Sequence, residues 1–148
     1  MAELARKRRA TFPSRQAAYE NYASKPPFNR LDPDALEAYV TFGFVDDAAG
    51  VTLACRREDE AAVYEGAPES GAWEHLADVR PTVTLLGGGD KNDPVSYALE
   101  DVARHLPRGG ARRFDGLDHF GPFEDPAGVG AVMAEAFGAA VHHDRPTV

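Results

Sequence analysis

The first half of the chain shows short apolar stripes at helical spacing. Two residues are placed to cap helices: Ser14 precedes one stripe, and Asp32 followed by Pro33 precedes another. Residues 11 and 12, just before Ser14, are expected to belong to the start of the first helix. Weaker patterns predict a strand over 51–55 and a helix over 57–64. We therefore expect residues 1–77 to form a helix-rich, irregular region.

The second half alternates strand and helix patterns. A run rich in β-branched and aliphatic residues is followed by three glycines, Gly87 to Gly89, as is typical of a buried strand. Beyond it lies an amphipathic helix pattern closed by Pro107 and the pair Gly109-Gly110. The predicted order strand, helix, strand, helix occupies residues 82–86, 95–106, 111–114 and 129–140.

This order predicts an α/β fold for residues 78–148. Two strands that are joined by a helix lie parallel to each other, because the helix forms a crossover connection. Helices then cover both faces of the sheet. Two strands make a poor sheet, because the open edge leaves backbone amides and carbonyls that another chain can pair with. We therefore expect an incomplete architecture, in which a β-α-β-α unit follows the helical region.

Composition and charge narrow the possible partners. The 148 residues are 43% hydrophobic and carry a net charge of −8, which disfavours binding to nucleic acids and anionic membranes. No apolar run approaches the roughly 18 residues of a membrane span. The sequence has one cysteine, Cys55, and no Cys/His spacing typical of zinc sites. We therefore expect no metal and no other cofactor. We expect a soluble, cytoplasmic protein.

Acid–base residues follow both predicted strands of the second half. Asp90 lies in the segment GGGDKNDP, and His119 lies in DHFGPFEDP. Ligands and catalytic groups gather at the carboxyl ends of parallel strands, which meet at one edge of the sheet. The sequence therefore predicts that Asp90 and His119 lie close together.

These segments resemble the C-terminal part of the α/β-hydrolase superfamily. The strand ending at Gly87, with Asp90 and Pro94, is similar to the family's penultimate strand and its G-x-x-D-x-x-x-P acid loop. The segment around His119 is similar to its catalytic-histidine loop, although Asp118 stands where the family more often has glycine. The match covers roughly residues 78–141.

The resemblance implies a fold and a set of roles. It implies that residues 1–77 form a helical cap and that residues 78–148 are the last two strands and helices of the hydrolase domain. It implies Asp90 as the acid of a catalytic triad, with Asp93 as the alternative acid, and His119 as the general base. In such a triad the carboxylate orients the imidazole, which takes the proton of a serine. Phe120, beside the histidine, is the expected substrate contact.

The nucleophile of such a hydrolase is absent from this sequence. None of the four serines has glycine at both −2 and +2, so the G-x-S-x-G elbow does not occur, and an HGGG-type oxyanion loop is missing too. The sequence predicts the C-terminal part of a serine hydrolase for an ester or related carbonyl substrate, inactive as an isolated chain. An N-terminal half would supply the main sheet and the serine. The alternative is a non-catalytic relic that acts as a binding module or forms a homodimer through its exposed strand edge.

Overall fold

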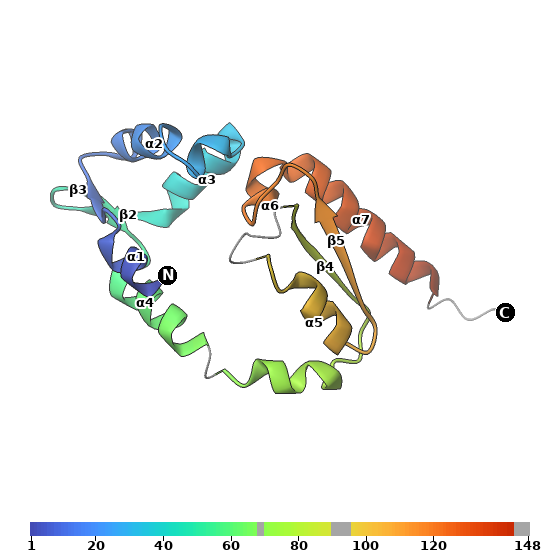
Figure 1. The fold of residues 1–148 in the computed structure, drawn as a ribbon. Helices are drawn as coiled ribbons and strands as arrows, with labels where there is room; N and C mark the ends of the chain where they lie inside the picture. Colours follow the sequence, from blue (N-terminus) through green and yellow to red (C-terminus); the bar gives the residue numbers. More distant parts are fainter. Residues whose placement is uncertain (68–69, 90–95, 144–148) are drawn as a thin grey trace. The chain divides into compact units, whose positions relative to one another are not determined.

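The computed structural model describes residues 1–67, 70–89 and 96–143, which fall into two compact units. The first unit spans Met1–Gly71 and the second spans Ala72–Val148. The sequence pattern predicts the change from the helical to the β-α-β-α region at residue 77, within the second unit. Figure 1 follows the elements of both units along the chain. Within the described part of the chain, no helix is both long and apolar enough to span a membrane.

The first unit combines helices with a small antiparallel sheet. Its helices are α1 (Ala2–Lys7), α2 (Arg15–Ala23), the short 3-10 helix η1 (Phe28–Arg30), α3 (Pro33–Gly43) and α4 (Arg57–Gly66). Its strands are β1 (Thr11–Phe12), β2 (Phe44–Asp47) and β3 (Gly50–Leu53), in the order β1-β3-β2.

Both predicted helix caps are confirmed. The Ser14 hydroxyl accepts a hydrogen bond of 3.1 Å from the backbone N–H of Ala17. The Asp32 carboxylate accepts bonds of 2.9 and 3.3 Å from the N–H groups of Asp34 and Ala35. These bonds satisfy amides that have no partner within the first turn of a helix, so each helix begins where its cap stands.

The sheet of the first unit was only partly predicted. The strand expected over 51–55 is β3, but Thr11 and Phe12, expected at a helix start, form β1 and pair with β3. Residues 48 and 49 form the turn between β2 and β3, and Gly50 then begins β3; its φ of 134° suits glycine, and an added Cβ would lie 2.3 Å from the Phe12 carbonyl oxygen. Strands this short show too little alternation for a pattern of period two to identify them.

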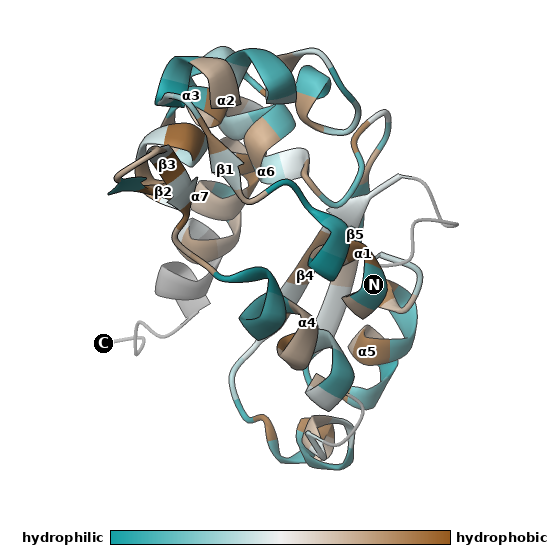
Figure 2. Ribbon diagram, turned by 90° about the vertical axis from the view of Figure 1, so that its left-hand side faces the viewer, coloured by the Kyte–Doolittle hydropathy of each residue, from teal (hydrophilic) through white to brown (hydrophobic). Residues whose placement is uncertain are grey.

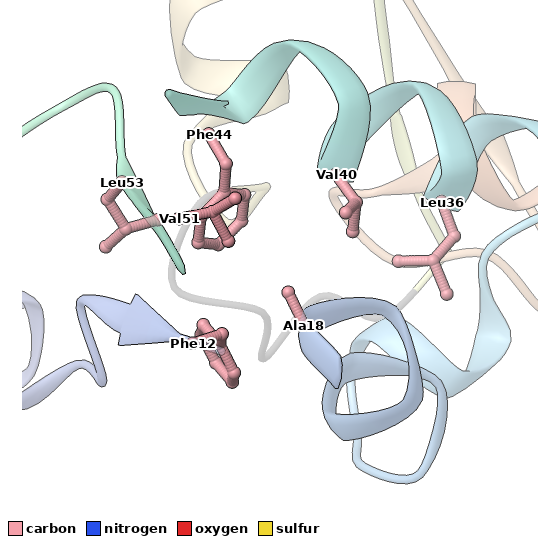
Figure 3. Packing of buried hydrophobic residues seen from close by; sticks show 7 residues of the cluster. All are labelled: Phe12, Ala18, Leu36, Val40, Phe44, Val51 and Leu53. Carbon is pink, nitrogen blue, oxygen red and sulfur yellow. The ribbon is translucent and has the colours of Figure 1, made fainter. Parts of the chain in front are cut away.

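One hydrophobic cluster holds the first unit together, as Figure 3 shows. The Phe12 and Phe44 rings meet edge to face with centroids 5.7 Å apart, and Tyr22 and Tyr39 meet similarly at 5.4 Å. At the border of the cluster, the Arg8 guanidinium donates a hydrogen bond of 2.7 Å to the Tyr39 hydroxyl and pairs with a glutamate of α4. The buried members are Phe12, Ala18, Leu36, Val40, Phe44, Val51 and Leu53.

The second unit has the predicted order of strand, helix, strand and helix. Its elements are the 3-10 helix η3 (Ala72–Asp78), β4 (Val83–Gly88), α5 (Leu99–His105), β5 (Gly109–Phe114), α6 (Gly121–Glu124) and α7 (Pro126–His143). The strands β4 and β5 pair in parallel, with Val83 opposite Gly109 and Gly88 opposite Phe114. Figures 1 and 2 both show α5 and α7 on opposite sides of these two strands.

Two details of the second unit differ from the expectation. The helix α5 ends at His105, before Pro107, but β5 begins at Gly109 and not at the expected residue 111. An added Cβ at Gly109 would lie 2.4 Å from the Ala103 carbonyl oxygen of α5, so glycine fits this start of the strand. The strands are only partly covered: most of β4 is half-buried but Thr84 is exposed, the first four residues of β5 are exposed, and β4 pairs only with β5 among the described residues. The helices of this unit therefore cover only part of its two strands.

The half-buried phenol of Tyr39 should make the stability of the chain pH-dependent. Burial raises the pKa of Tyr39 to about 12, because the phenolate would lose its hydration, and repulsion by a Tyr22 phenolate adds to the effect. An unfolded tyrosine has a pKa of about 10, so the stabilising effect of the neutral phenol is complete below pH ~10 and is lost as the pH rises through 12. We expect the free energy of unfolding to fall more steeply over this range in the wild type than in Tyr39→Phe.

Urea unfolding followed by circular dichroism between pH 9 and pH 12 measures this difference. Tyr64→Phe, which removes the phenol of an exposed tyrosine, is the control and should keep the wild-type slope. Equal slopes for the wild type and Tyr39→Phe would contradict the prediction.

Candidate active site

The predicted base, His119, lies in the loop that follows β5. Its side chain is exposed, and its ring lies against that of Phe120 with the centroids 4.3 Å apart. The predicted acid Asp90 and its alternative Asp93 lie outside the described residues, which end on this side at Gly89. The structure therefore places the histidine at the carboxyl end of β5, and its pairing with an acid stays a prediction.

Short polar contacts shape the turn that carries His119. The Asp118 carboxylate accepts a hydrogen bond of 2.7 Å from the N–H of Phe120, so it bridges the histidine as an Asx turn does. The Asp118 N–H donates to the Glu124 carboxylate at 3.0 Å, and the N–H of Gly121 donates to the Asp118 carbonyl at 3.0 Å. The unusual aspartate of this loop therefore has a local role: its carboxylate helps to hold the backbone on both sides of the histidine.

The end of β4 touches the His119 loop backbone to backbone. A Cβ added at Gly88 would lie 2.6 Å from both the Leu117 carbonyl oxygen and the Asp118 Cα, so only glycine fits there. The N–H of Gly89 donates a hydrogen bond of 3.0 Å to the same Leu117 oxygen. The carboxyl ends of the two strands thus meet at one edge of the sheet, as the strand order predicted.

At this edge of the sheet, a largely buried arginine that the sequence analysis did not identify bonds to β4, to α5 and to the turn before α5. The Arg113 side chain is 13% exposed and forms two hydrogen bonds, of 2.6 and 2.7 Å, with the Glu100 carboxylate of α5. It also donates to the carbonyl oxygens of Gly88 at 2.7 Å and Ser96 at 2.9 Å. The signal in the sequence was the pair Arg112-Arg113 within a predicted strand, since successive side chains point to opposite faces and one of the two must point inward.

A small, mostly apolar cavity of about 170 Å³ adjoins His119. Its size is close to the ~150 Å³ cavity that holds a benzene molecule in another protein. A histidine on the rim of such a cavity is placed to exchange a proton with a group bound inside. Phe120, the predicted substrate contact, does not line it. The lining residues are Leu86, Gly87, Gly88, Ser96, Leu99, Phe114, Leu117, Asp118, His119, Gly121, Pro122 and Val129.

Over the residues that the structure describes, no three side chains of His, Cys, Asp or Glu come together as a metal site would require. The residues with polar side chains that line the cavity are His119, Asp118 and Ser96, whose groups can form hydrogen bonds.

Comparison with solved structures identifies the fold. The chain is similar to the crystal structure of E-2-(acetamidomethylene)succinate hydrolase, with a TM-score of 0.69 and 18% sequence identity. The similarity covers 85% of this chain but 46% of the hydrolase chain, so this chain spans about half the length of that protein. No protein-family model and no curated protein matches the sequence. The chain therefore has a partial α/β-hydrolase fold, which confirms the predicted fold class.

The contact between Gly88 and the His119 loop can be tested by adding one methyl group. We expect Gly88→Ala to destabilise the chain by about 1–3 kcal/mol, because the new Cβ meets backbone atoms that cannot turn aside. Gly110→Ala on the partner strand is the matched control, since its Cβ would meet nothing within 4 Å, and its effect should stay within about 0.5 kcal/mol. Thermal unfolding measures both variants, and an equal loss in the two would contradict the proposed close approach.

Proposed function

We propose that this chain is the acid–base part of a hydrolase that acts on an ester or a related carbonyl substrate. His119 is its general base and Asp90 its acid, while residues 1–77 take the role of a helical cap. The observation that carries the proposal is the position of His119, whose exposed ring stands at the carboxyl end of β5 on the rim of an apolar cavity. The partial hydrolase fold of the chain supports it.

In this function the chain handles the protons of the reaction. The His119 imidazole takes the proton of a serine hydroxyl as its oxygen attacks the carbonyl carbon of the substrate, and then gives that proton to the leaving group. The Asp90 carboxylate holds the imidazole in the tautomer that accepts this proton. Phe120, packed on the His119 ring, limits how the ring can turn and offers an apolar surface to the substrate.

The serine must come from polypeptide outside this sequence, which contains no G-x-S-x-G segment. Two observations support the need for further chain: this chain spans 46% of a similar hydrolase, and β4 pairs on one edge only among the described residues. Beside that strand, a groove of about 480 Å³ separates it from α7, and Met133 and Phe137 of α7 are 46% and 69% exposed. A neighbouring strand with its helix would cover these groups.

The same open edge favours a second candidate function, that of a non-catalytic module that forms a homodimer. Two copies of β4 could pair edge to edge and remove the unpaired backbone groups. Light scattering with size-exclusion chromatography separates the candidates: a module is a stable dimer with a cooperative unfolding transition, whereas an acid–base part is a monomer that another polypeptide stabilises.

The isolated chain should have essentially no esterase activity. Triad members act as a unit, and this sequence lacks both the serine and the oxyanion loop. We expect p-nitrophenyl acetate to be hydrolysed at the same background rate by the wild type, His119→Ala and Ser96→Ala. Ser96 is included because it is a buried serine that lines the cavity. Turnover that is lost in both variants would place the nucleophile within this chain and contradict the proposal.

The positive test adds the missing part. The DNA next to the coding sequence is searched for a reading frame that encodes G-x-S-x-G, and its product is expressed together with this chain. We expect ester hydrolysis that needs both polypeptides and falls by about 10³-fold or more in kcat in His119→Ala and in the Ser→Ala variant of the elbow. Activity of the added polypeptide without this chain, or no loss in His119→Ala, would overturn the proposed role.

A further inference from the structure

We propose that Arg113 is a positioning residue for this candidate site: its guanidinium fixes the end of β4, the turn before α5 and the His119 loop in one arrangement. The inference rests on the proposed function, because it assigns Arg113 a role toward His119 and Asp90. It concerns a residue on β5 that acts through the backbone of neighbouring segments.

The contacts of Arg113 lie on both sides of the segment that carries Asp90. Before the segment, the guanidinium donates to the Gly88 carbonyl oxygen at 2.7 Å. After it, the same group donates to the Ser96 carbonyl oxygen at 2.9 Å and holds the Glu100 carboxylate through two bonds. One side chain therefore fixes the two points at which this segment leaves and rejoins the described fold.

The peptide group between Gly88 and Gly89 connects Arg113 to the histidine loop. The Gly88 carbonyl and the Gly89 N–H belong to the same planar unit, whose two polar atoms point in opposite directions. Arg113 donates to the oxygen of this unit, and the nitrogen donates to the Leu117 carbonyl at 3.0 Å, two residues before His119. If the unit turned, both bonds would break together.

The chemistry of the side chain suits this task. A guanidinium presents five donors in a rigid planar fork and stays charged, so it can make the four bonds of Arg113, two to a carboxylate and one to each of two carbonyl oxygens, whereas an ammonium has only three donors on a flexible stem. The Arg113 side chain is 13% exposed, while its neighbour Arg112 is 53% exposed and pairs with Glu135 at 3.4 Å. Arg112 therefore offers a matched control with the same charge and an adjacent position.

The experiment uses the full chain labelled with ¹⁵N and records the signals of the two His119 ring nitrogens at one fixed pH. These signals report the tautomer and the hydrogen bonds of the ring. We expect Arg113→Gln to shift them toward the values found in Asp90→Asn, and to make amide exchange of Gly89 about tenfold faster, while the β5 amides keep their rate. Arg112→Gln should leave both readouts unchanged.

Each outcome decides one of the assignments. If Arg113→Gln lowers the thermal midpoint but leaves the His119 signals and the Gly89 exchange as in the wild type, Arg113 is only structural and the inference is overturned. An equal shift in Arg112→Gln would also overturn it, because the loss of any nearby positive charge would then be enough to shift the His119 signals. If Asp90→Asn leaves the His119 signals unchanged while Arg113→Gln still shifts them, the acid of the proposed function is wrong and the positioning role stands.

A second variant covers the case in which Arg113→Gln does not fold. Arg113→Lys keeps the positive charge but has three donors in place of the four bonds of Arg113, so it should show a smaller shift of the His119 signals in the same direction. Wild-type signals in a folded Arg113→Lys variant would overturn the inference.

Discussion

The second unit depends on one close approach, in which the backbone of β4 meets the His119 loop with no side chain between them. Parallel strands set their ends side by side, but side chains would normally keep the following loops apart. The glycines at the end of β4 remove that spacing, so that the Gly89 N–H reaches the Leu117 oxygen directly. The position of the His119 backbone is thus set by backbone geometry, while its ring lies against that of Phe120.

The sheet that carries this contact is only partly covered by the helices of its own unit. A parallel pair is ordinarily buried on both faces, because its crossover helices cover it. Here the exposed Thr84 and the groove beside α7 show that the second unit buries one part of its strands and leaves another open. Arg113 offsets part of this deficit by tying β4, β5 and α5 together through charge-assisted bonds in the half-buried edge where the site lies.

Local signals in the sequence predicted most helices and the order of the second unit. Capping by Ser14 and Asp32 depends on bonds within four residues, and the helix stripes depend on spacing of similar range. Of the antiparallel sheet, only β3 was predicted. The strand β1 escaped prediction because Thr11 pairs with Thr52, far along the chain, and a strand of two residues has no pattern of its own. The role of Arg113 was hidden for the same reason: its partners come from three elements that only the fold brings together.

The proposed division of a hydrolase site between two polypeptides has a physical basis in this topology. In that proposal the acid and the base belong to one β-α-β-α unit, and contacts within this unit place the His119 loop: β4 pairs with β5, and the Gly89 N–H bonds the Leu117 carbonyl oxygen. A serine elbow and an oxyanion hole need other strands of the sheet. Because triad members act as a unit, catalysis does not fall in proportion to the missing length; it is lost almost completely. Under the proposed function, a chain that spans about half the length of a similar hydrolase therefore keeps the histidine loop but depends on a partner for catalysis.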